Sequence, residues 1–258
     1  MNRGKRERSR WVVSLPVAGL ERELALINQK LDKCFRLKSG HVGGFISIEW
    51  DKFDRVFYPM LVLLSAKSVG TFGAKVLELA AATQLIVLAN RLHRDLPEEP
   101  GRSVLVGDYL YSCFNQILCS SGNIDLLEPL AGLIQDLSKL SIRQIEERLP
   151  LNLRDAQQES LIAGMACGIA AGLGLTSQED VKRLKSYGEN LGYAWAWRKS
   201  GKENLPPEVC ERLERAGMAV QGLTPTSVRE CIEARQNLIA LAQWIANEFS
   251  VNKRYMVG

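Results

Sequence analysis

The chain has 258 residues, of which 46% are apolar and 24% are charged, enough for one large domain with a substantial core. Its formal net charge is +4, and much of the excess lies in Arg3, Lys5, Arg6, Arg8 and Arg10. The body is therefore near neutral, which argues against nucleic-acid binding. No uncharged apolar run approaches the roughly 20 residues that span a bilayer, so we expect a soluble protein without a transmembrane segment.

Residues 1–18 are expected to form a basic, flexible leader, followed by one helical domain over residues 19–258. The leader imitates a secretory signal, but no small-x-small cleavage site follows it and charge returns at Glu21, so secretion is not expected. The six cysteines are scattered among mostly apolar neighbours, and the chain has only two histidines. This usage is typical of reduced thiols in a cytoplasmic protein, and a zinc site is not expected.

Apolar residues recur at steps of four and three from Leu20 to Cys34, which predicts an amphipathic helix. A Leu-rich helix is expected to follow Pro59. The same period predicts further helices over residues 74–93, 104–118, 124–148, 155–173, 178–197 and 226–249. No stretch alternates as a strand does. The sequence therefore predicts an all-α protein, a single-domain bundle of about nine or ten helices.

Proline, glycine and small polar residues separate these helices, at positions 97–101, 121–123, 150, 172–177 and 201–207. Pro97 cannot lie in a helix interior, so the preceding helix should end near Arg94. Thr176-Ser177 places a hydroxyl cap before Gln178, and Thr224-Pro225-Thr226 precedes the last long helix. These signals set the expected helix boundaries.

Two segments carry a resemblance to a known family. They are Gly107-Asp108-Tyr109-Leu110 and Tyr187-Gly188-Glu189-Asn190-Leu191-Gly192-Tyr193-Ala194. Their order and spacing resemble those of the trans-polyprenyl diphosphate synthases, and the resemblance spans roughly residues 20 to 250. It implies the all-α isoprenoid-synthase fold and a relation to the prenyltransferases of isoprenoid biosynthesis.

The resemblance also implies a lost metal site. In that family, two Asp-Asp-x-x-Asp motifs hold the magnesium ions that bind the substrate's diphosphate. The matching positions here are Arg94, Asp95 and Glu98 for the first motif and Lys199, Ser200 and Glu203 for the second. Without the carboxylates the metal has no cage, so we expect no cofactor and no catalytic residue of the usual kind.

The family's diphosphate-binding basic residues are mostly replaced as well. The segment before the Leu-rich helix keeps only Arg55, and Gln157 corresponds to the lysine of the family's Lys-Thr-Ala motif. What remains as possible diphosphate contacts is Arg55, His93 and Lys202.

Two interpretations of Arg94 and Lys199 remain open. The two cations can contact a diphosphate directly, in place of the metal. Alternatively, they pair with Asp95 and Glu203 across the former cleft and tie the helices together without a ligand. The second, structural interpretation is favoured.

The family's metal and substrate ligands are replaced here, while the segments that mark its fold remain. This selective loss leads to three functional hypotheses. The leading one is a noncatalytic subunit of a heteromeric polyprenyl diphosphate synthase, whose partner is a catalytic synthase chain; a homodimer is also open. The second is a protein that binds an isoprenoid or another lipid in the former prenyl cavity, where Ala81, Ala82 and Ala89 leave space. The third is a residual prenyltransferase with an altered mechanism.

Overall fold

The computed structural model describes residues 19–37, 40–41, 54–94, 100–200 and 205–251. Its helices are α1 (Glu21–Phe35), α2 (Asp54–Ser68), α3 (Ala74–Arg94), α4 (Pro100–Ser120), α5 (Leu127–Glu146), α6 (Leu151–Ala171), α7 (Gln178–Lys199), α8 (Pro207–Gln221) and α9 (Arg229–Val251). A short 3₁₀ turn, η2 (Ile124–Leu126), precedes α5, and two-residue strands β1 (Arg36–Leu37) and β2 (Gly40–His41) pair after α1. The all-α prediction is confirmed.

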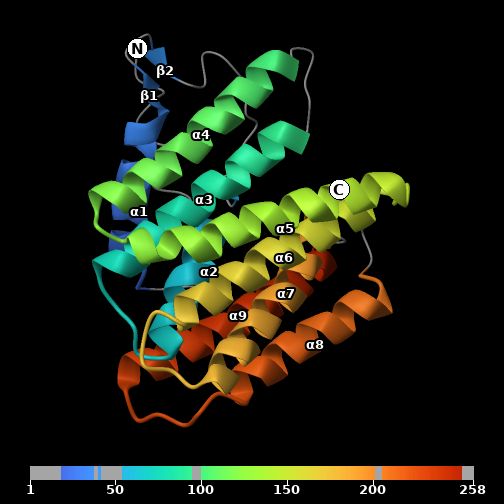
Figure 1. Cartoon of the computed structure of the whole chain (residues 1–258). Helices are drawn as coiled ribbons and strands as arrows, with labels where there is room; N and C mark the ends of the chain where they lie inside the picture. The colour runs from blue at the N-terminus through green and yellow to red at the C-terminus, as the bar shows by residue number, and fades with distance from the viewer. Residues whose placement is uncertain (1–18, 38–39, 42–53, 95–99, 201–204, 252–258) are drawn as a thin grey trace, which may run out of the picture.

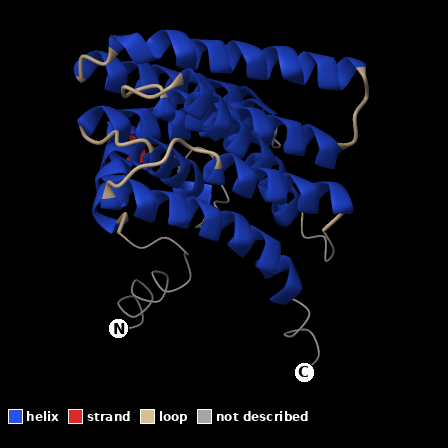
Figure 2. Ribbon diagram, turned by 90° about the horizontal axis from the view of Figure 1, so that it is seen from below, coloured by secondary structure: helices blue, strands red, loops and turns tan. Residues whose placement is uncertain are grey.

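The helices pack side by side in a bundle. Figure 1 shows α5, α6, α7 and α8 running alongside one another, with α3 and α4 beside them. Figure 2 shows the same helices from below, joined mostly by short loops. Among the described residues, no helix is both long and apolar enough to cross a membrane.

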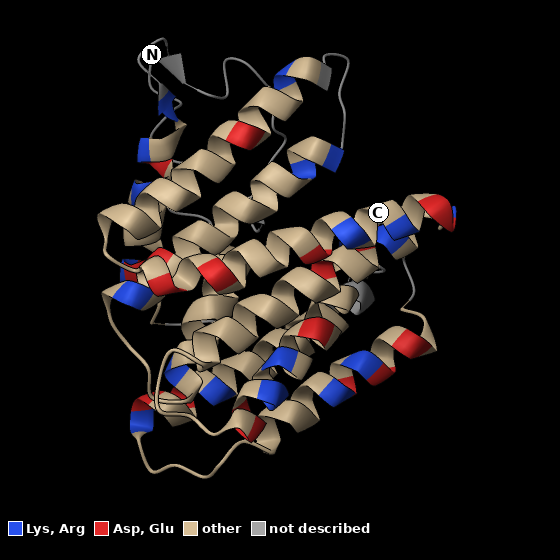
Figure 3. Cartoon of the chain, viewed as in Figure 1, with Lys and Arg blue, Asp and Glu red and all other residues tan. Residues whose placement is uncertain are grey.

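Helix α3 forms the centre of the core. All of its residues from 78 to 90 are buried, which is typical of a helix enclosed on every side. Glu78 is the charged member of this run, and its carboxylate accepts a hydrogen bond from Lys30 Nζ of α1 at 2.7 Å. Figure 3 shows the basic C-terminal end of α3 and little charge along the rest of the helix.

The closest helix pair is α6 and α7, and glycines allow the approach. A Cβ added at Gly188 would lie 2.3 Å from the Ala163 carbonyl oxygen, and one added at Gly192 would lie 2.3 Å from the Glu159 carbonyl oxygen. No side chain fits at either position without moving α7 away from α6. The Tyr187–Ala194 segment is therefore a packing motif that sets the distance between these two helices.

Most predicted boundaries agree with the structure. Helix α3 ends at Arg94, as Pro97 requires, and the Ser177 hydroxyl accepts a hydrogen bond from Asp180 N at 3.0 Å, which caps α7. Helix α9 begins at Arg229, three residues after the expected start. Thr226 Oγ1 accepts a hydrogen bond from Val228 N at 3.2 Å, so this hydroxyl shapes the turn before the helix.

Two expectations were wrong. Pro59 lies inside α2, which begins at Asp54, so the Leu-rich helix starts before the proline and not after it. Helix α8 had not been expected, because Pro206 and Pro207 suggested only a break. Pro207 occupies the first position of α8, where a helix has no use for the missing N–H and the fixed φ of proline is favourable.

Candidate functional site

The ends of α3 and α7 meet the first half of α6, at the place where the resemblance puts the metal site. Arg94 is the last residue of α3 and Lys199 is the last residue of α7. Helix α6 contributes Asp155 and Glu159, one turn apart on the same face. Basic residues from two helices therefore face acidic residues from a third.

Glu159 is the central residue of this arrangement. Its side chain is only 4% exposed, and its Oε1 forms ion pairs with Arg91 Nη2 at 3.1 Å and with Lys199 Nζ. Arg91 belongs to α3 and Lys199 to α7, so one buried carboxylate links three helices. Charge-assisted hydrogen bonds of this kind are stronger than neutral ones.

Arg94 makes the second link between α3 and α6. Its Nη1 lies 3.2 Å from Asp155 Oδ1 and donates a hydrogen bond to Gln158 Oε1 at 3.1 Å. The Arg94 and Asp155 side chains are each about one quarter to one third exposed, at 23% and 34%. This pair is therefore the solvent-facing edge of the site, and Glu159 is its buried centre.

A buried amide network supports the ion pairs. Gln158 is 1% exposed; its Oε1 also accepts a hydrogen bond from Asn90 Nδ2 at 3.0 Å. Its Nε2 donates to Ser141 Oγ at 3.1 Å and to Gln144 Oε1 at 3.2 Å, which connects α6 to α5. A fully bonded buried network holds its members in one arrangement, so α6 presents its acidic face in a fixed position.

We call Arg91, Arg94, Asp155, Glu159 and Lys199 the inverted cluster. The resemblance implies carboxylates on the helices that match α3 and α7; here Arg94 and Lys199 stand at these positions and face acidic residues of α6. Three cations against two carboxylates leave a formal charge of +1. Magnesium needs several oxygen ligands at short range, and each of the two carboxylates already has one oxygen paired with a cation, so these residues do not fit the ion.

The remaining residues of the acidic motifs divide into two groups. Ser200 is the exposed C-cap of α7, and its hydroxyl donates to the Trp197 carbonyl oxygen at 2.8 Å. Asp95, Glu98, Lys202 and Glu203 lie outside the described residues. Within the described residues there is no group of three or more His, Cys, Asp or Glu side chains that could hold a metal. The expected loss of the magnesium site stays a prediction.

His93 contacts α4 and not the inverted cluster. Its Nε2 lies 3.2 Å from the Val104 carbonyl oxygen and 3.2 Å from Asp108 Oδ1. A Cβ added at Gly107 would lie 2.3 Å from this nitrogen, so the glycine makes room for the imidazole between α3 and α4. Gly107 and Asp108, in the first of the two segments that carry the resemblance, therefore accommodate the His93 side chain. Arg55 is exposed near the start of α2.

An aromatic column fixes the last turn of α7. Trp195 is fully buried and stacks on Phe57 of α2, with ring centroids 4.4 Å apart and an interplanar angle of 15°. The Arg198 guanidinium lies 4.7 Å from the Trp195 ring centroid and 4.3 Å from that of Trp244 in α9. Stacking and cation–π contacts therefore hold this turn against α2 and α9, which positions Lys199 toward α6.

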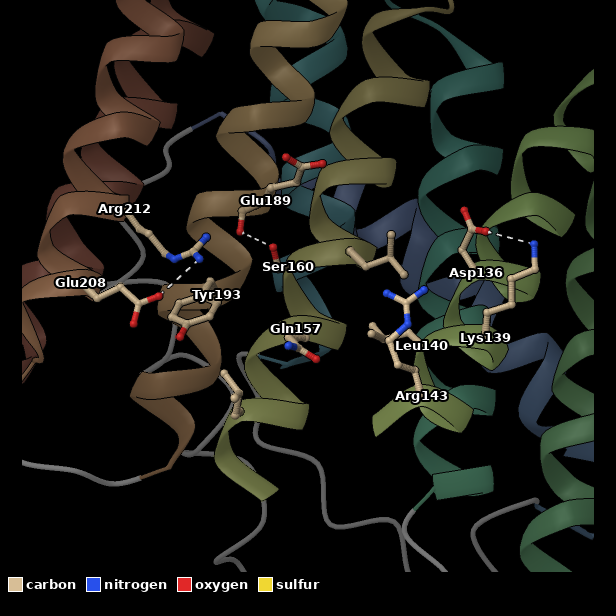
Figure 4. Close-up of a pocket in the computed structure, with 12 residues that line it drawn as sticks. Asp136, Lys139, Leu140, Arg143, Gln157, Ser160, Glu189, Tyr193, Glu208 and Arg212 are labelled. Carbon is tan, nitrogen blue, oxygen red and sulfur yellow. Dashed lines mark hydrogen bonds and ion pairs between the residues drawn. The ribbon is translucent and has the colours of Figure 1, made fainter. Parts of the chain in front are cut away.

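The opposite face of α6 borders a groove of about 590 Å³ between α5, α6, α7 and α8. Gln157, which matches the family's diphosphate-binding lysine, lies here, and its Oε1 accepts a hydrogen bond from Gln144 Nε2 at 2.8 Å. Ser160 donates to the Glu189 carbonyl oxygen at 2.8 Å. Figure 4 shows both α6 side chains facing the groove.

The charges of this groove balance. Its basic and acidic lining residues are Lys139, Arg143 and Arg212 against Asp136, Glu189 and Glu208. Figure 4 shows Arg212 beside Glu208, at 3.4 Å, and Lys139 beside Asp136, at 3.9 Å. A groove without net charge offers no field that favours a diphosphate, so the inverted cluster is the more informative site.

The sequence had not identified Asp155 and Glu159 as the partners of the basic residues. Glu159 is 40 positions before Lys199 and 68 after Arg91, so no local pattern connects them. The signal that was present is two acids four residues apart on one face of α6. Such a pair near a helix start is unremarkable on a solvated face, and it becomes informative only because Glu159 is buried.

Comparison with known proteins gives a consistent relation. No protein-family model matches the chain. The octaprenyl diphosphate synthase of Escherichia coli (strain K12) is 27% identical over 165 residues, which covers 53% of this chain and 49% of that protein. The chain therefore spans about half the length of the curated relatives it matches.

Solved structures share the fold over most of the chain. The apo form of an Arabidopsis medium/long-chain length prenyl pyrophosphate synthase has a TM-score of 0.72 at 18% identity and covers 91% of this chain and 99% of that one. The geranyl diphosphate synthase small subunit from Antirrhinum majus has a TM-score of 0.63 at 14% identity, with 86% and 99% covered. The chain is thus similar in part of its sequence to octaprenyl diphosphate synthases, and it shares the fold of prenyl diphosphate synthases over most of its length.

Proposed function

We propose that this protein is a noncatalytic subunit of a heteromeric polyprenyl diphosphate synthase, which acts in isoprenoid biosynthesis by assembling with a catalytic chain of the same family. The observation that carries the proposal is the inverted cluster, in which Lys199 and Arg94 replace metal-binding carboxylates and are bound by Glu159 and Asp155. The scaffold is kept while the charge pattern of the reaction centre is reversed.

The reversal matters because of the chemistry the family performs. Ionisation of an allylic diphosphate leaves a carbocation and a leaving group of about three negative charges, which needs strong positive stabilisation. Magnesium would have to displace Lys199 and Arg91 from Glu159, a buried carboxylate. Separating a buried ion pair costs several kcal/mol, and the ejected cations would then repel the metal.

The alternative in which Arg94 and Lys199 bind a diphosphate directly has less support. Both cations already have carboxylate partners on α6, and the inverted cluster has a formal charge of only +1. A diphosphate would compete with Asp155 and Glu159 and would repel both of them. A residual prenyltransferase of altered mechanism is therefore the weaker proposal.

A heteromeric assembly has a parallel among the structural relatives. One of them is described as a geranyl diphosphate synthase small subunit, and this chain covers 99% of it at a TM-score of 0.63. That description concerns the other protein, and the shared fold alone does not transfer its role. It supports the proposal by showing that this fold occurs in a chain named as one subunit of such a synthase.

A prenyl-transfer assay tests the proposal. The purified chain, an intact polyprenyl diphosphate synthase from the same cells, and an equimolar mixture are each supplied with an allylic diphosphate, isopentenyl diphosphate and Mg²⁺. We expect no turnover by the chain alone and a changed rate or product length in the mixture. Elongation by the chain alone would contradict the noncatalytic role, and a mixture identical to the synthase alone would contradict the subunit role.

A further inference from the structure

Two cysteines from distant parts of the sequence share one groove. Cys34, in the last turn of α1, and Cys113, in the middle of α4, both line a groove of about 410 Å³ between α1, α3 and α4. The Tyr109 hydroxyl donates a hydrogen bond to the Cys34 carbonyl oxygen at 2.8 Å, which fixes the end of α1 on α4. Cys113 follows Tyr109 by four residues, so its side chain lies on the same face of α4.

The two thiols are neighbours with unequal access to solvent. The Cys34 and Cys113 side chains both line the groove, and each of them shifts the pKa of the other. Cys34 is half-buried at the groove, whereas Cys113 is 3% exposed. Both residues border the groove, so a small solute that enters it can approach either one, and Cys34 is the more exposed of the two.

The charged residues that line the groove are mostly basic. Lys30 and Lys33 of α1 line the groove, together with Glu78 of α3, whose carboxylate is 2.7 Å from Lys30 Nζ. Two cations against one carboxylate leave an excess of positive charge beside the sulfurs. Nearby cations stabilise the anionic form of a cysteine.

The hydrogen bonds of the pair act in the same direction. The interaction with Cys34 outweighs burial and lowers the pKa of the Cys113 thiol to about 7. The pKa of Cys34 is raised by its bond to Cys113 and by burial. Burial and the hydrogen bond to Cys113 raise the pKa of Tyr109 to about 12, so its phenol stays a donor. The pair therefore holds a single thiolate near neutral pH.

We propose that Cys34 and Cys113 form a peroxide-responsive dithiol, which closes into a disulfide that joins α1 to α4. The proposal goes beyond the subunit role and does not depend on it. It rests on the shared groove, on the Tyr109 anchor to Cys34 and on the position of Cys113 one turn after Tyr109 on the same face of α4.

The chemistry balances with a hydroperoxide as the oxidant. The Cys113 thiolate attacks one peroxide oxygen; the S–O bond forms, the O–O bond breaks, and hydroxide leaves, which gives a sulfenic acid and reduces the peroxide by two electrons. The Cys34 sulfur then attacks the Cys113 sulfur. The S–S bond forms, the S–O bond breaks, and the released oxygen leaves as water with the proton of Cys34. A dithiol reductant cleaves this disulfide and restores both thiols.

The other cysteines supply internal comparisons. Cys119 and Cys210 are exposed, so they compete for any oxidant on access alone. Cys167 is fully buried, and burial raises the pKa of its thiol to about 12, which keeps it protonated and unreactive. Selective reaction at Cys34 and Cys113 would thus reflect their pairing and not exposure.

Thiol mapping on the full-length chain tests the proposal. The reduced protein is treated with equimolar hydrogen peroxide at pH 7, its free thiols are blocked with N-ethylmaleimide, and the digest is analysed by mass spectrometry without reductant. We expect a Cys34–Cys113 cross-linked peptide as the main early product, lost on treatment with dithiothreitol. Oxidation of Cys119 or Cys210 before this pair would overturn the proposal.

Variants and a pH series separate the two sulfurs. In Cys34→Ser, Cys113 should stop at the sulfenic acid, detected as a dimedone adduct; in Cys113→Ser, the oxidation of Cys34 should slow about tenfold, as expected for a thiol without a lowered pKa. Cys119→Ser and Cys210→Ser are the matched controls and should leave the cross-link unchanged.

The unmutated protein gives an independent readout, because the rate at which peroxide forms the cross-link should level off above about pH 7. A rate that keeps rising through pH 9 would contradict a stabilised thiolate.

Discussion

Glu159 is a buried acid whose basic partners come from two different helices, and this position determines the effect of removing its charge. Glu159→Gln leaves Lys199 and Arg91 as partly buried cations without their carboxylate. Loss of one partner from a buried ion pair costs about 3 kcal/mol. We expect the free energy of unfolding, measured in urea at pH 7, to fall by about this amount.

The control for Glu159→Gln is the same change in an exposed pair. Glu211 binds Arg215 one turn away on α8, and both side chains are 64% exposed. Glu211→Gln should change the free energy of unfolding by less than about 0.5 kcal/mol, because solvent screens such pairs. Equal effects of the two substitutions would show that Glu159 is not the structural centre of the inverted cluster.

Asp180 predicts how stability depends on pH. Burial alone would raise its pKa, but hydrogen bonds from Thr224 and Ser177, with the charge of Arg235, lower the pKa below its usual value. The folded state therefore binds a proton less readily than the unfolded chain. Its stabilising effect is present above the unfolded pKa of about 3.9 and is lost as pH falls through the folded value.

Asp180→Asn checks this sign. Thr224 N donates to Asp180 Oδ1 at 3.0 Å, and a neutral amide oxygen is a weaker acceptor, so the variant should be less stable by about 1 kcal/mol at pH 7. The difference between variant and wild type should shrink as pH falls toward 3, because wild-type Asp180 becomes neutral too. Urea unfolding at pH 7 and pH 3 measures it; a difference that does not change with pH would assign the acid sensitivity to other carboxylates.

At the scale of elements, the contact between α6 and α7 depends on glycine. Gly192→Ala would place a Cβ 2.3 Å from the Glu159 carbonyl oxygen, which α7 can relieve only by moving off α6. We expect a loss of about 1–3 kcal/mol in the free energy of unfolding, as for other overpacked cores. Chemical denaturation monitored by far-UV circular dichroism measures it.

Gly217 of α8 is the matched control, since an added Cβ there meets no atom within 4 Å. Alanine is the better helix former, so Gly217→Ala should raise the free energy of unfolding by up to about 1 kcal/mol. If Gly192→Ala were stabilising in the same way, α6 and α7 would not be in the close contact that defines the site.

The sequence predicts some helices and site residues better than others. Helices such as α3 and α7 could be predicted because apolar period, cap and proline all agree, whereas α8 was missed because Pro207 was taken as a break and not as a first helical residue. Arg94 and Lys199 were identified from their positions in the segments that match the family's acidic motifs, whereas Arg91 was not. Their partners Asp155 and Glu159 were not, because pairing across 40 or more residues is decided by tertiary packing that no local pattern records.

At the scale of the whole molecule, the fold matches solved prenyl diphosphate synthases over about nine tenths of the chain. The ends of α3 and α7, in contrast, carry cations that are paired with carboxylates of α6. A protein built this way should not respond to the ligands of an active synthase. Its contribution would come from contact with another chain.

Thermal unfolding with and without metal tests the first of these statements. Mg²⁺ with inorganic diphosphate should leave the Tm of this chain unchanged relative to a chelator, because a ligand stabilises only a state that binds it. An intact polyprenyl diphosphate synthase run in parallel should show an increase. A metal-dependent increase in the Tm of this chain would mean that a magnesium site remains.

Native mass spectrometry of the tagged chain, purified from its own cells, tests the subunit role. We expect a stable complex with a second chain that carries both Asp-Asp-x-x-Asp motifs of an active polyprenyl diphosphate synthase. A homo-oligomer or monomer without such a chain would contradict the subunit role, and an isoprenoid bound to it would favour a lipid-binding protein instead.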